Sequence, residues 1–263
     1  MVISVAKKKV KRKLNKKACL VMLLTLYLII MAFYYCLNLP IKNIVIKGNN
    51  IITDDEILNV SELSDAKYMF KINSRNIKKR IKTLSIINDV TINKSLSGKL
   101  ELTITEKKVL YYSVLDKSYI LEDGTTMDNL DIVGVPLLVN YIPSDIKTTL
   151  IKKMNNINYD NISLISEIEY SPNIKNDVTI DGNRFLLRMN DGNIVYINLA
   201  NFDKMDKYME VYATLNEGQK GVIYFDSSSE RVVFQPFELI KKKESEKNEL
   251  SEWIKKTYYF TRL

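Results

Sequence analysis

The longest apolar segment of the chain is residues 18–37, which contain no charged residue, Pro or Gly. A helix of this length, at about 1.5 Å per residue, matches the roughly 30 Å hydrocarbon core of a bilayer. The alternatives are a buried core helix, which seldom needs this length, and a cleaved signal. A signal usually has about 7–15 apolar residues and a small-residue cleavage site, whereas Asn38-Leu39-Pro40 follows here. The pattern therefore predicts a transmembrane helix over 18–37.

Charges on the two flanks of this helix predict its orientation. Residues 1–17 carry eight Lys or Arg and no acidic residue, whereas the fifteen residues after the helix carry only two basic residues, Lys42 and Lys47. Basic flanks stay in the cytoplasm. We therefore expect a basic cytoplasmic tail over 1–17 and an extracytoplasmic region over 38–263.

The hydrophobic pattern just after the helix predicts a strand and then a short helix. Within Ile41–Lys47, Ile44 and Ile46 alternate with Asn43, Val45 and Lys47, which predicts a strand. The turn after it is predicted at Gly48-Asn49-Asn50. Thr53 is followed three residues later by Glu56, the spacing of a helix N-cap.

A second helix and a hairpin follow. Ile77, Ile81 and Leu84 recur at spacings of four and three after Asn73-Ser74, which predicts an amphipathic helix. Ile86–Asn93 and Leu100–Glu106 read as strands joined by a turn at Ser97-Gly98-Lys99. The predicted order is β-α-α-β-β.

Strands predominate from Val109 onward, with two helices between them. One helix is predicted to open at Ser144 and to continue to Ile157, and a second to be capped by Asn201 and to reach Leu215. The last two apolar runs, 222–225 and 232–234, flank a polar turn. The other predicted strands are Val109–Leu115, Tyr119–Glu122, Ile165–Tyr170, Val178–Ile180, Arg184–Met189 and Ile194–Asn198.

The composition changes again after Pro236. A polar run is followed by an apolar set at helical spacing, namely Leu250, Trp253, Ile254 and Tyr258. This pattern fits an amphipathic helix that packs on the domain, contacts the membrane or holds a partner, or else a frayed terminus.

Composition excludes several classes of function. The chain has 39 basic and 31 acidic residues, so removal of the eight in the tail leaves 31 of each and no basic nucleic-acid-binding domain. The absence of His excludes Ser-His-Asp and Cys-His mechanisms and His-ligated metals. Cys19 and Cys36, about 25 Å apart on the helix, cannot form a disulfide within the chain. We therefore expect no catalytic residue, cofactor, metal site or small-molecule substrate.

The segment 41–58, IKNIVIKGNNIITDDEIL, resembles the opening of a POTRA module. Ile87–Val90 and Leu100–Glu106 resemble that module's later strands. The chain departs from the usual pattern at two places. Its hairpin has Ser95-Leu96-Ser97-Gly98 where Pro-Asn is common, and its closing strand ends in Glu106-Lys107-Lys108-Val109 where an acidic residue, a basic residue and Pro are common. A basic tail, one membrane helix, one POTRA module and a β-rich domain together are similar to the FtsQ/DivIB cell-division proteins.

This resemblance implies an α+β fold with an N-terminal transmembrane helix. It divides the extracytoplasmic region into a β-α-α-β-β POTRA domain over 41–107, a β-rich mixed α/β domain over 108–238 and a C-terminal tail over 239–263. The implied function is a non-catalytic, single-pass scaffold of the divisome, at the septum, which binds FtsL-like and FtsB/DivIC-like bitopic proteins and other divisome membrane proteins.

The resemblance also implies a site in the last hairpin. A late strand with an exposed edge would pair with an extended segment of a partner, while aromatic side chains supply buried area. The alternative is an ordinary core hairpin. The implied partner-binding residues are Tyr224, Phe225, Ser227, Val232, Val233 and Phe234.

Two other functions fit the sequence. One is a membrane-anchored, chaperone-like POTRA module that binds exported peptides. The other is a membrane-bound hydrolase that uses a carboxylate pair. Co-purification with two small bitopic proteins would favour the scaffold, broad peptide binding the second function, and loss of activity on mutation of one acidic pair the third.

Overall fold

The computed structural model describes residues 15–130, 132–227, 232–243 and 245. Its first element is the apolar helix α1 (Lys16–Leu37), which begins two residues before the predicted span. Asn15 caps it by accepting a hydrogen bond from the Lys17 N–H. No residue of α1 is buried, as expected of a helix whose surroundings are lipid rather than protein. The chain divides into two compact units, residues 1–105 and 106–263.

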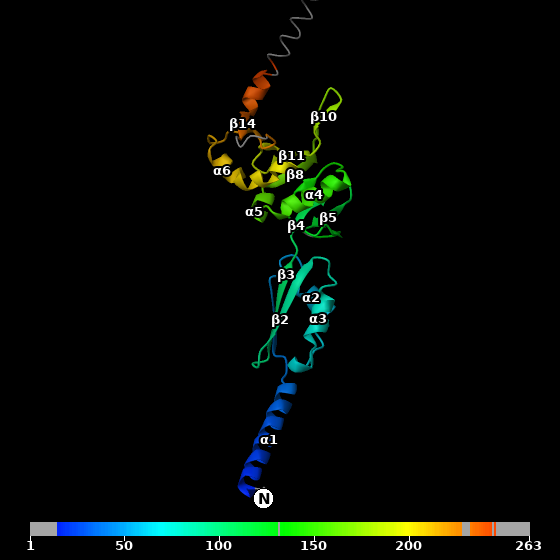
Figure 1. Ribbon diagram of the computed structural model, residues 1–263, viewed down its shortest axis with the longest axis vertical. Helices are drawn as coiled ribbons and strands as arrows, with labels where there is room; N and C mark the ends of the chain where they lie inside the picture. The colour runs from blue at the N-terminus through cyan, green and yellow to red at the C-terminus, as the bar shows by residue number, and fades with distance from the viewer. Residues whose placement is uncertain (1–14, 131, 228–231, 244, 246–263) are drawn as a thin grey trace, which may run out of the picture. The chain divides into compact units, whose positions relative to one another are not determined.

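The first unit continues from α1 into a small α/β domain (Figure 1). Its three strands lie in the order β1-β3-β2, with β1 parallel to β3. The predicted order of elements is confirmed, with one added 3₁₀ turn. The elements are β1 (Asn43–Lys47), α2 (Asp54–Ser61), the 3₁₀ turn η1 (Met69–Lys71), α3 (Ser74–Ile81), β2 (Ile87–Lys94) and β3 (Lys99–Glu106).

Local side-chain chemistry fixes both helices of this domain. Thr53 accepts a hydrogen bond from the Glu56 N–H at 3.3 Å, and Asn73 accepts from the Arg75 N–H at 3.0 Å. Each bond satisfies a backbone donor that a helix start leaves without a partner. The helices cover one face of the sheet, where Ile57 of α2 and Ile81 of α3 are fully buried.

The second unit is built on a nine-stranded mixed sheet (Figure 1). Its strand order is β14-β13-β12-β11-β8-β7-β4-β5-β6, and β9 and β10 form a separate two-stranded hairpin. The strands of the large sheet are β4 (Val109–Ser113), β5 (Ser118–Leu121), β6 (Thr126–Met127), β7 (Leu137–Leu138), β8 (Ile165–Tyr170), β11 (Arg184–Met189), β12 (Ile194–Asn198), β13 (Gly221–Tyr224) and β14 (Val233–Pro236); the hairpin comprises β9 (Asn173–Lys175) and β10 (Val178–Asp181).

Helices complete the core of this unit on one face of the large sheet. The buried set joins Leu150 and Met154 to strand residues such as Leu187, Ile197 and Ile223. The helices are α4 (Ser144–Asn155), α5 (Tyr159–Ile162), the 3₁₀ helix η2 (Leu199–Lys207) and α6 (Tyr208–Ala213). The structure also shows helix over 237–243.

The structure confirms one predicted helix start and corrects the caps of two helices. α4 begins at Ser144, as predicted, but its N-cap position is Pro143, so Ser144 is not the capping residue we expected and no side chain caps this helix. The cap of η2 is Asn198, whose side chain accepts from the Asn201 N–H at 3.0 Å. Asn201 itself has non-helical φ and ψ within η2, so the predicted single helix is a 3₁₀ segment followed by a short α-helix.

Candidate functional site

The last strand, β14, lies at one edge of the nine-stranded sheet. It pairs antiparallel with β13, and no other described strand pairs with its opposite side. The Phe237 N–H donates to Lys220 O at 3.1 Å, toward β13. Because N–H groups alternate along a strand, the N–H of Phe234 is directed to the free edge. Pro236, which lacks an N–H, occupies a position where none is needed for the ladder.

The six residues implied by the resemblance lie on and beside this strand, but their side chains face in different directions. Phe225 is fully buried in the core, and Val232 and Phe234 are partly buried against it. Tyr224 is half-buried and Val233 is 51% exposed. In this structure the Phe225 side chain packs in the core and is not accessible to a partner.

Tyr224 and Val233 belong to a row across the sheet on the face opposite the helices. Tyr196 of β12 is in register with Tyr224 of β13, which is in register with Val233 of β14. The rings of Tyr196 and Tyr224 are stacked, with centroids 5.5 Å apart. Burial, and secondarily the neighbouring Tyr196, raises the pKa of the Tyr224 hydroxyl above its ordinary value. The row ends in an exposed apolar side chain at the free edge.

An ion pair supports this row from beside it. Arg184 Nε lies 2.7 Å from Asp226 Oδ2, and both side chains are largely buried. The Arg184 guanidinium also lies 3.7 Å above the ring of Tyr196, in cation–π geometry. Arg184 therefore connects the aromatic row to the segment that leaves β13.

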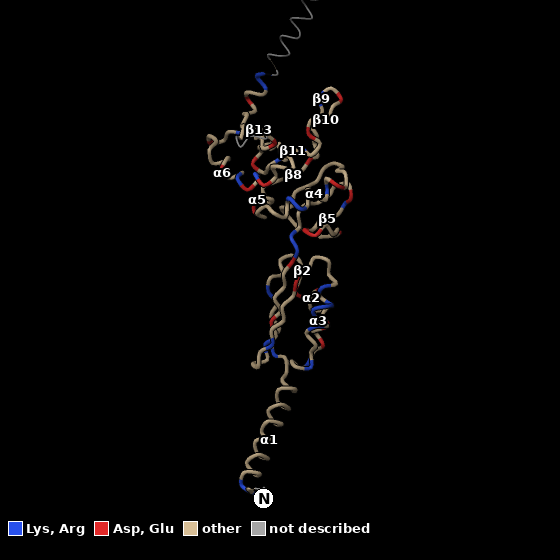
Figure 2. The backbone as a smooth tube through the Cα atoms, in the orientation of Figure 1, with Lys and Arg blue, Asp and Glu red and all other residues tan. Residues whose placement is uncertain are grey.

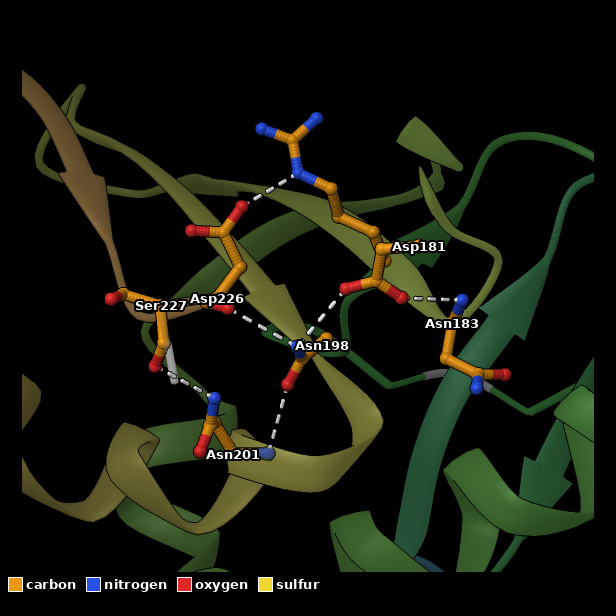
Figure 3. A network of polar contacts seen from close by, with 7 residues as sticks. Asp181, Asn183, Asn198, Asn201, Asp226 and Ser227 are labelled. Carbon is orange, nitrogen blue, oxygen red and sulfur yellow. Dashed lines mark hydrogen bonds and ion pairs between the residues drawn. The ribbon is translucent and has the colours of Figure 1, made fainter. Parts of the chain in front are cut away.

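Amide side chains hold the same segment in place (Figure 3). Asn198 Nδ2 donates to Asp226 O at 3.2 Å and to Asp181 Oδ2 at 3.0 Å. Asn201 Nδ2 and Lys204 Nζ both donate to Ser227 O, each at 3.1 Å. The Phe225 N–H donates to Tyr196 O at 2.7 Å. Hydrogen bonds to the backbone thus hold residues 225–227 in place directly after β13 ends at Tyr224.

Sequence reasoning missed the residues that organise this edge. Arg184, Tyr196 and Asn198 lie 23 to 37 residues before the last hairpin begins at Gly221, and only strand pairing brings them to it. A partial signal existed for Tyr196. The alternation within Ile194–Asn198 places Val195 and Ile197 inside and Tyr196 on the other face.

Comparison with known proteins agrees with this architecture. Residues 39–107 match the family described as POTRA domain, FtsQ-type. The chain is 28% identical to cell division protein DivIB of Bacillus subtilis over 246 residues, 90% of each chain. It is 29% identical to DivIB of Listeria monocytogenes over 231 residues, 85% of this chain and 84% of that one.

Two shorter similarities were also found. DivIB of Clostridium botulinum is 32% identical over 116 residues, 43% of this chain and 44% of that one. The solved extracytoplasmic domain of DivIB from Geobacillus stearothermophilus, in its trans isomer, is 22% identical, with a TM-score of 0.34 over 44% of this chain and 99% of that chain. That TM-score is too low to support an inference.

One apolar helix, an FtsQ-type POTRA domain and a β-rich domain define a class of single-pass membrane proteins whose extramembrane region is α+β. Long matches to DivIB proteins narrow that class. Within that class, the chain is similar over most of its length to the FtsQ/DivIB bacterial cell-division proteins.

Proposed function

We propose that this chain is a non-catalytic, membrane-anchored scaffold of the divisome. In this proposal α1 anchors it with the N-terminus in the cytoplasm, the POTRA domain docks a neighbouring divisome membrane protein, and β14 captures the extracytoplasmic ends of FtsL-like and FtsB/DivIC-like proteins. Septal wall synthesis would then be recruited and regulated by contacts. Similarity to named cell-division proteins supports the role.

The observation that carries the partner site is the free edge of β14. An edge strand presents N–H and C=O groups with which an extended segment can pair, and pockets or exposed side chains beside it add specificity. Val233 and the half-buried Tyr224 supply apolar area on one face of that edge. Phe225, Val232 and Phe234 contribute from the core side, by keeping β13 and β14 in register.

The first test is Val233→Glu in the full chain, with FtsL-like and FtsB/DivIC-like proteins co-purified from detergent-solubilised membranes. A carboxylate at this exposed edge position should lower recovery of both partners about tenfold or more, because pairing would desolvate the charge. The matched control is Val178→Glu, which changes a 65% exposed Val on the separate hairpin. Circular dichroism should show both variants folded.

These two variants test the β14 binding site and the scaffold role separately. Partner recovery lost with Val233→Glu and kept with Val178→Glu would support both. Recovery unchanged in both variants would refute the β14 site, and absence of either partner with the wild-type chain would refute the scaffold. Binding of unrelated exported peptides at β14 would instead favour a chaperone-like module.

A further inference from the structure

The segment that leaves the membrane helix is bound to the 3₁₀ turn η1 of the POTRA domain. The cap of α1 is Asn38, and the next residue, Leu39, is buried. The Met69 N–H donates to Leu39 O at 2.9 Å, and the Ile41 N–H donates to Lys67 O at 3.1 Å. Since a residue spans at most about 3.6 Å, η1 lies within roughly 15 Å of the end of α1.

The β2–β3 turn is bound to the same segment. Gly98 O accepts from the Lys42 N–H at 2.8 Å and from the Asn43 N–H at 3.3 Å. Gly98 has φ +87°, and a Cβ there would lie 3.0 Å from Pro40 O, so only Gly lets the turn approach this closely. Lys94 Nζ also donates to Ile72 O at 2.6 Å, which joins the hairpin to η1.

These two turns expose apolar side chains next to the point where the chain leaves the bilayer. Tyr68 is 38% exposed, Phe70 39% and Leu96 70%. Singly exposed apolar side chains are common on proteins, but these three lie on the two turns that bind the segment leaving α1. Tyr and other amphipathic side chains favour the membrane–water interface, where Tyr34 and Tyr35, in the last turn of α1, are also expected.

The charge of the same turns is positive. Residues 38–43, 66–72 and 93–99 contain five Lys and no Asp or Glu. Lys71 Nζ lies 4.3 Å from the ring centroid of Tyr68, and Lys94 Nζ lies 6.0 Å from that of Phe70. Figure 2, in which Lys and Arg are blue, shows blue segments where the domain joins α1. Apolar tips with ammonium groups beside them match the acyl boundary and the phosphates of an anionic lipid surface.

We propose that Tyr68, Phe70, Lys71, Lys94 and Leu96 form a membrane-docking surface. It binds anionic phospholipid headgroups in the leaflet where α1 ends, with the Leu96 and Phe70 side chains at the acyl boundary. The POTRA domain is then held against the bilayer by its own surface as well as by α1. This surface lies at the start of β1, at the opposite end of the POTRA sheet from the turn at Gly48. The proposal does not depend on the β14 site.

The test uses the full chain in lipid nanodiscs made of phosphatidylcholine with phosphatidylglycerol. Cys19 and Cys36 are replaced by Ala, and a nitroxide label is placed at Leu96→Cys. The matched control carries the label at Asp55→Cys, an exposed position at the start of α2, beyond the far end of β1. Electron paramagnetic resonance then measures collision of each label with a water-soluble nickel complex and with oxygen.

We expect the label at residue 96 to collide with the nickel complex about threefold less often than the label at 55, and more often with oxygen, as at a bilayer interface. The same protein with Tyr68→Ser and Phe70→Ser should lose this protection. The labelled protein without the Ser substitutions should also lose its protection in nanodiscs of phosphatidylcholine alone, because the ammonium groups then face no anionic lipid.

Equal nickel accessibility at 96 and 55 would overturn the proposal, and would leave the surface available for a protein partner. Protection that survives both Ser substitutions would overturn the assignment of Tyr68 and Phe70. Protection that is the same without phosphatidylglycerol would overturn the anionic ligand. Thermal melts of the labelled variants exclude unfolding as the cause of any change.

Discussion

Gly48 shows how one residue determines the closing of the POTRA sheet. It has φ +82°, and a Cβ there would overlap Ile104 O of β3. Gly48→Ala should therefore lower the free energy of unfolding of this domain by about 2–3 kcal/mol, through both strain and overlap. Chemical unfolding followed by circular dichroism measures the loss.

A second glycine separates strain from overlap. Gly134 has the same φ of +82°, and no described atom lies within 4 Å of the Cβ it would carry. Gly134→Ala should cost about 1 kcal/mol, the conformational part alone. An equal loss in the two variants would show that contact with Ile104 is not what requires glycine at 48.

The free energy of unfolding should respond differently to loss of the hydroxyl at two buried tyrosines. Tyr208 donates to Asp191 Oδ2 at 2.6 Å, whereas the buried Tyr111 hydroxyl has no hydrogen-bond partner among the described residues. Tyr208→Phe should lower the free energy of unfolding by about 1–2 kcal/mol, and Tyr111→Phe should leave it unchanged or raise it. Urea unfolding at neutral pH tests both, and a loss in Tyr111→Phe equal to that in Tyr208→Phe would contradict the assignment.

The same tyrosines predict a loss of stability at alkaline pH. Burial raises the pKa of Tyr111, and burial together with the Asp191 hydrogen bond raises that of Tyr208. The folded state therefore keeps protons that the unfolded state releases above pH about 10, so their contribution is complete below that pH and is lost above it. Each Tyr→Phe variant should show a smaller fall in unfolding free energy across pH 10 than the wild type.

At the scale of elements, the position of β14 depends on a cap in another part of the sheet. Asn198 caps η2 and also holds Asp226 O, so Asn198→Ala should loosen residues 225–227 and destabilise the second unit by about 1–2 kcal/mol. Amide hydrogen exchange should become faster in β13 and β14. Asn158→Ala is the control, because Asn158 caps α5, apart from this edge. Equal acceleration of β14 in both variants would show that the cap acts only through global stability.

Elements with strong local signals were predictable from the sequence. Three local predictions are confirmed: Thr53 as a cap, a helix that starts at Asn73 or Ser74, and the alternation of apolar residues in β3. Each depends on near neighbours in the sequence. The strands β6 and β7 have two residues each, too few for a periodic pattern, and were not predicted. The 3₁₀ geometry of η2 was also missed, because helical spacing over nine residues does not distinguish the two helix types.

The candidate site was predictable only in position along the chain. The last hairpin was proposed correctly as a pair of strands, β13 and β14. Which side chains face the core was not predictable, because apolar runs such as 222–225 lack alternation. That β14 is an edge strand follows from pairing among strands far apart in sequence. The six implied partner-binding residues therefore stay a prediction, with Val233 the most accessible test.

For the whole molecule, the two hydrophobic cores predict two unfolding transitions. The residues of the large core all belong to the unit over 106–263, and Ile57, Ile77 and Ile81 pack within the unit over 1–105. Each unit therefore has buried apolar side chains of its own, and we expect each to unfold as a separate cooperative body. Scanning calorimetry of the full chain in detergent should resolve two transitions, or one broad transition that a variant separates.

Variants in each unit assign these transitions. Gly48→Ala should lower only one midpoint, by about 8–24 °C, because 1 kcal/mol corresponds to about 4–8 °C for a domain of this size. Asn193→Ala should lower only the other, because Asn193 is buried in the second unit and accepts the Gly221 N–H at 2.9 Å at the start of β13. If either substitution shifts both transitions equally, the units unfold as one cooperative body, and a defect in the POTRA domain would then weaken the β14 edge as well.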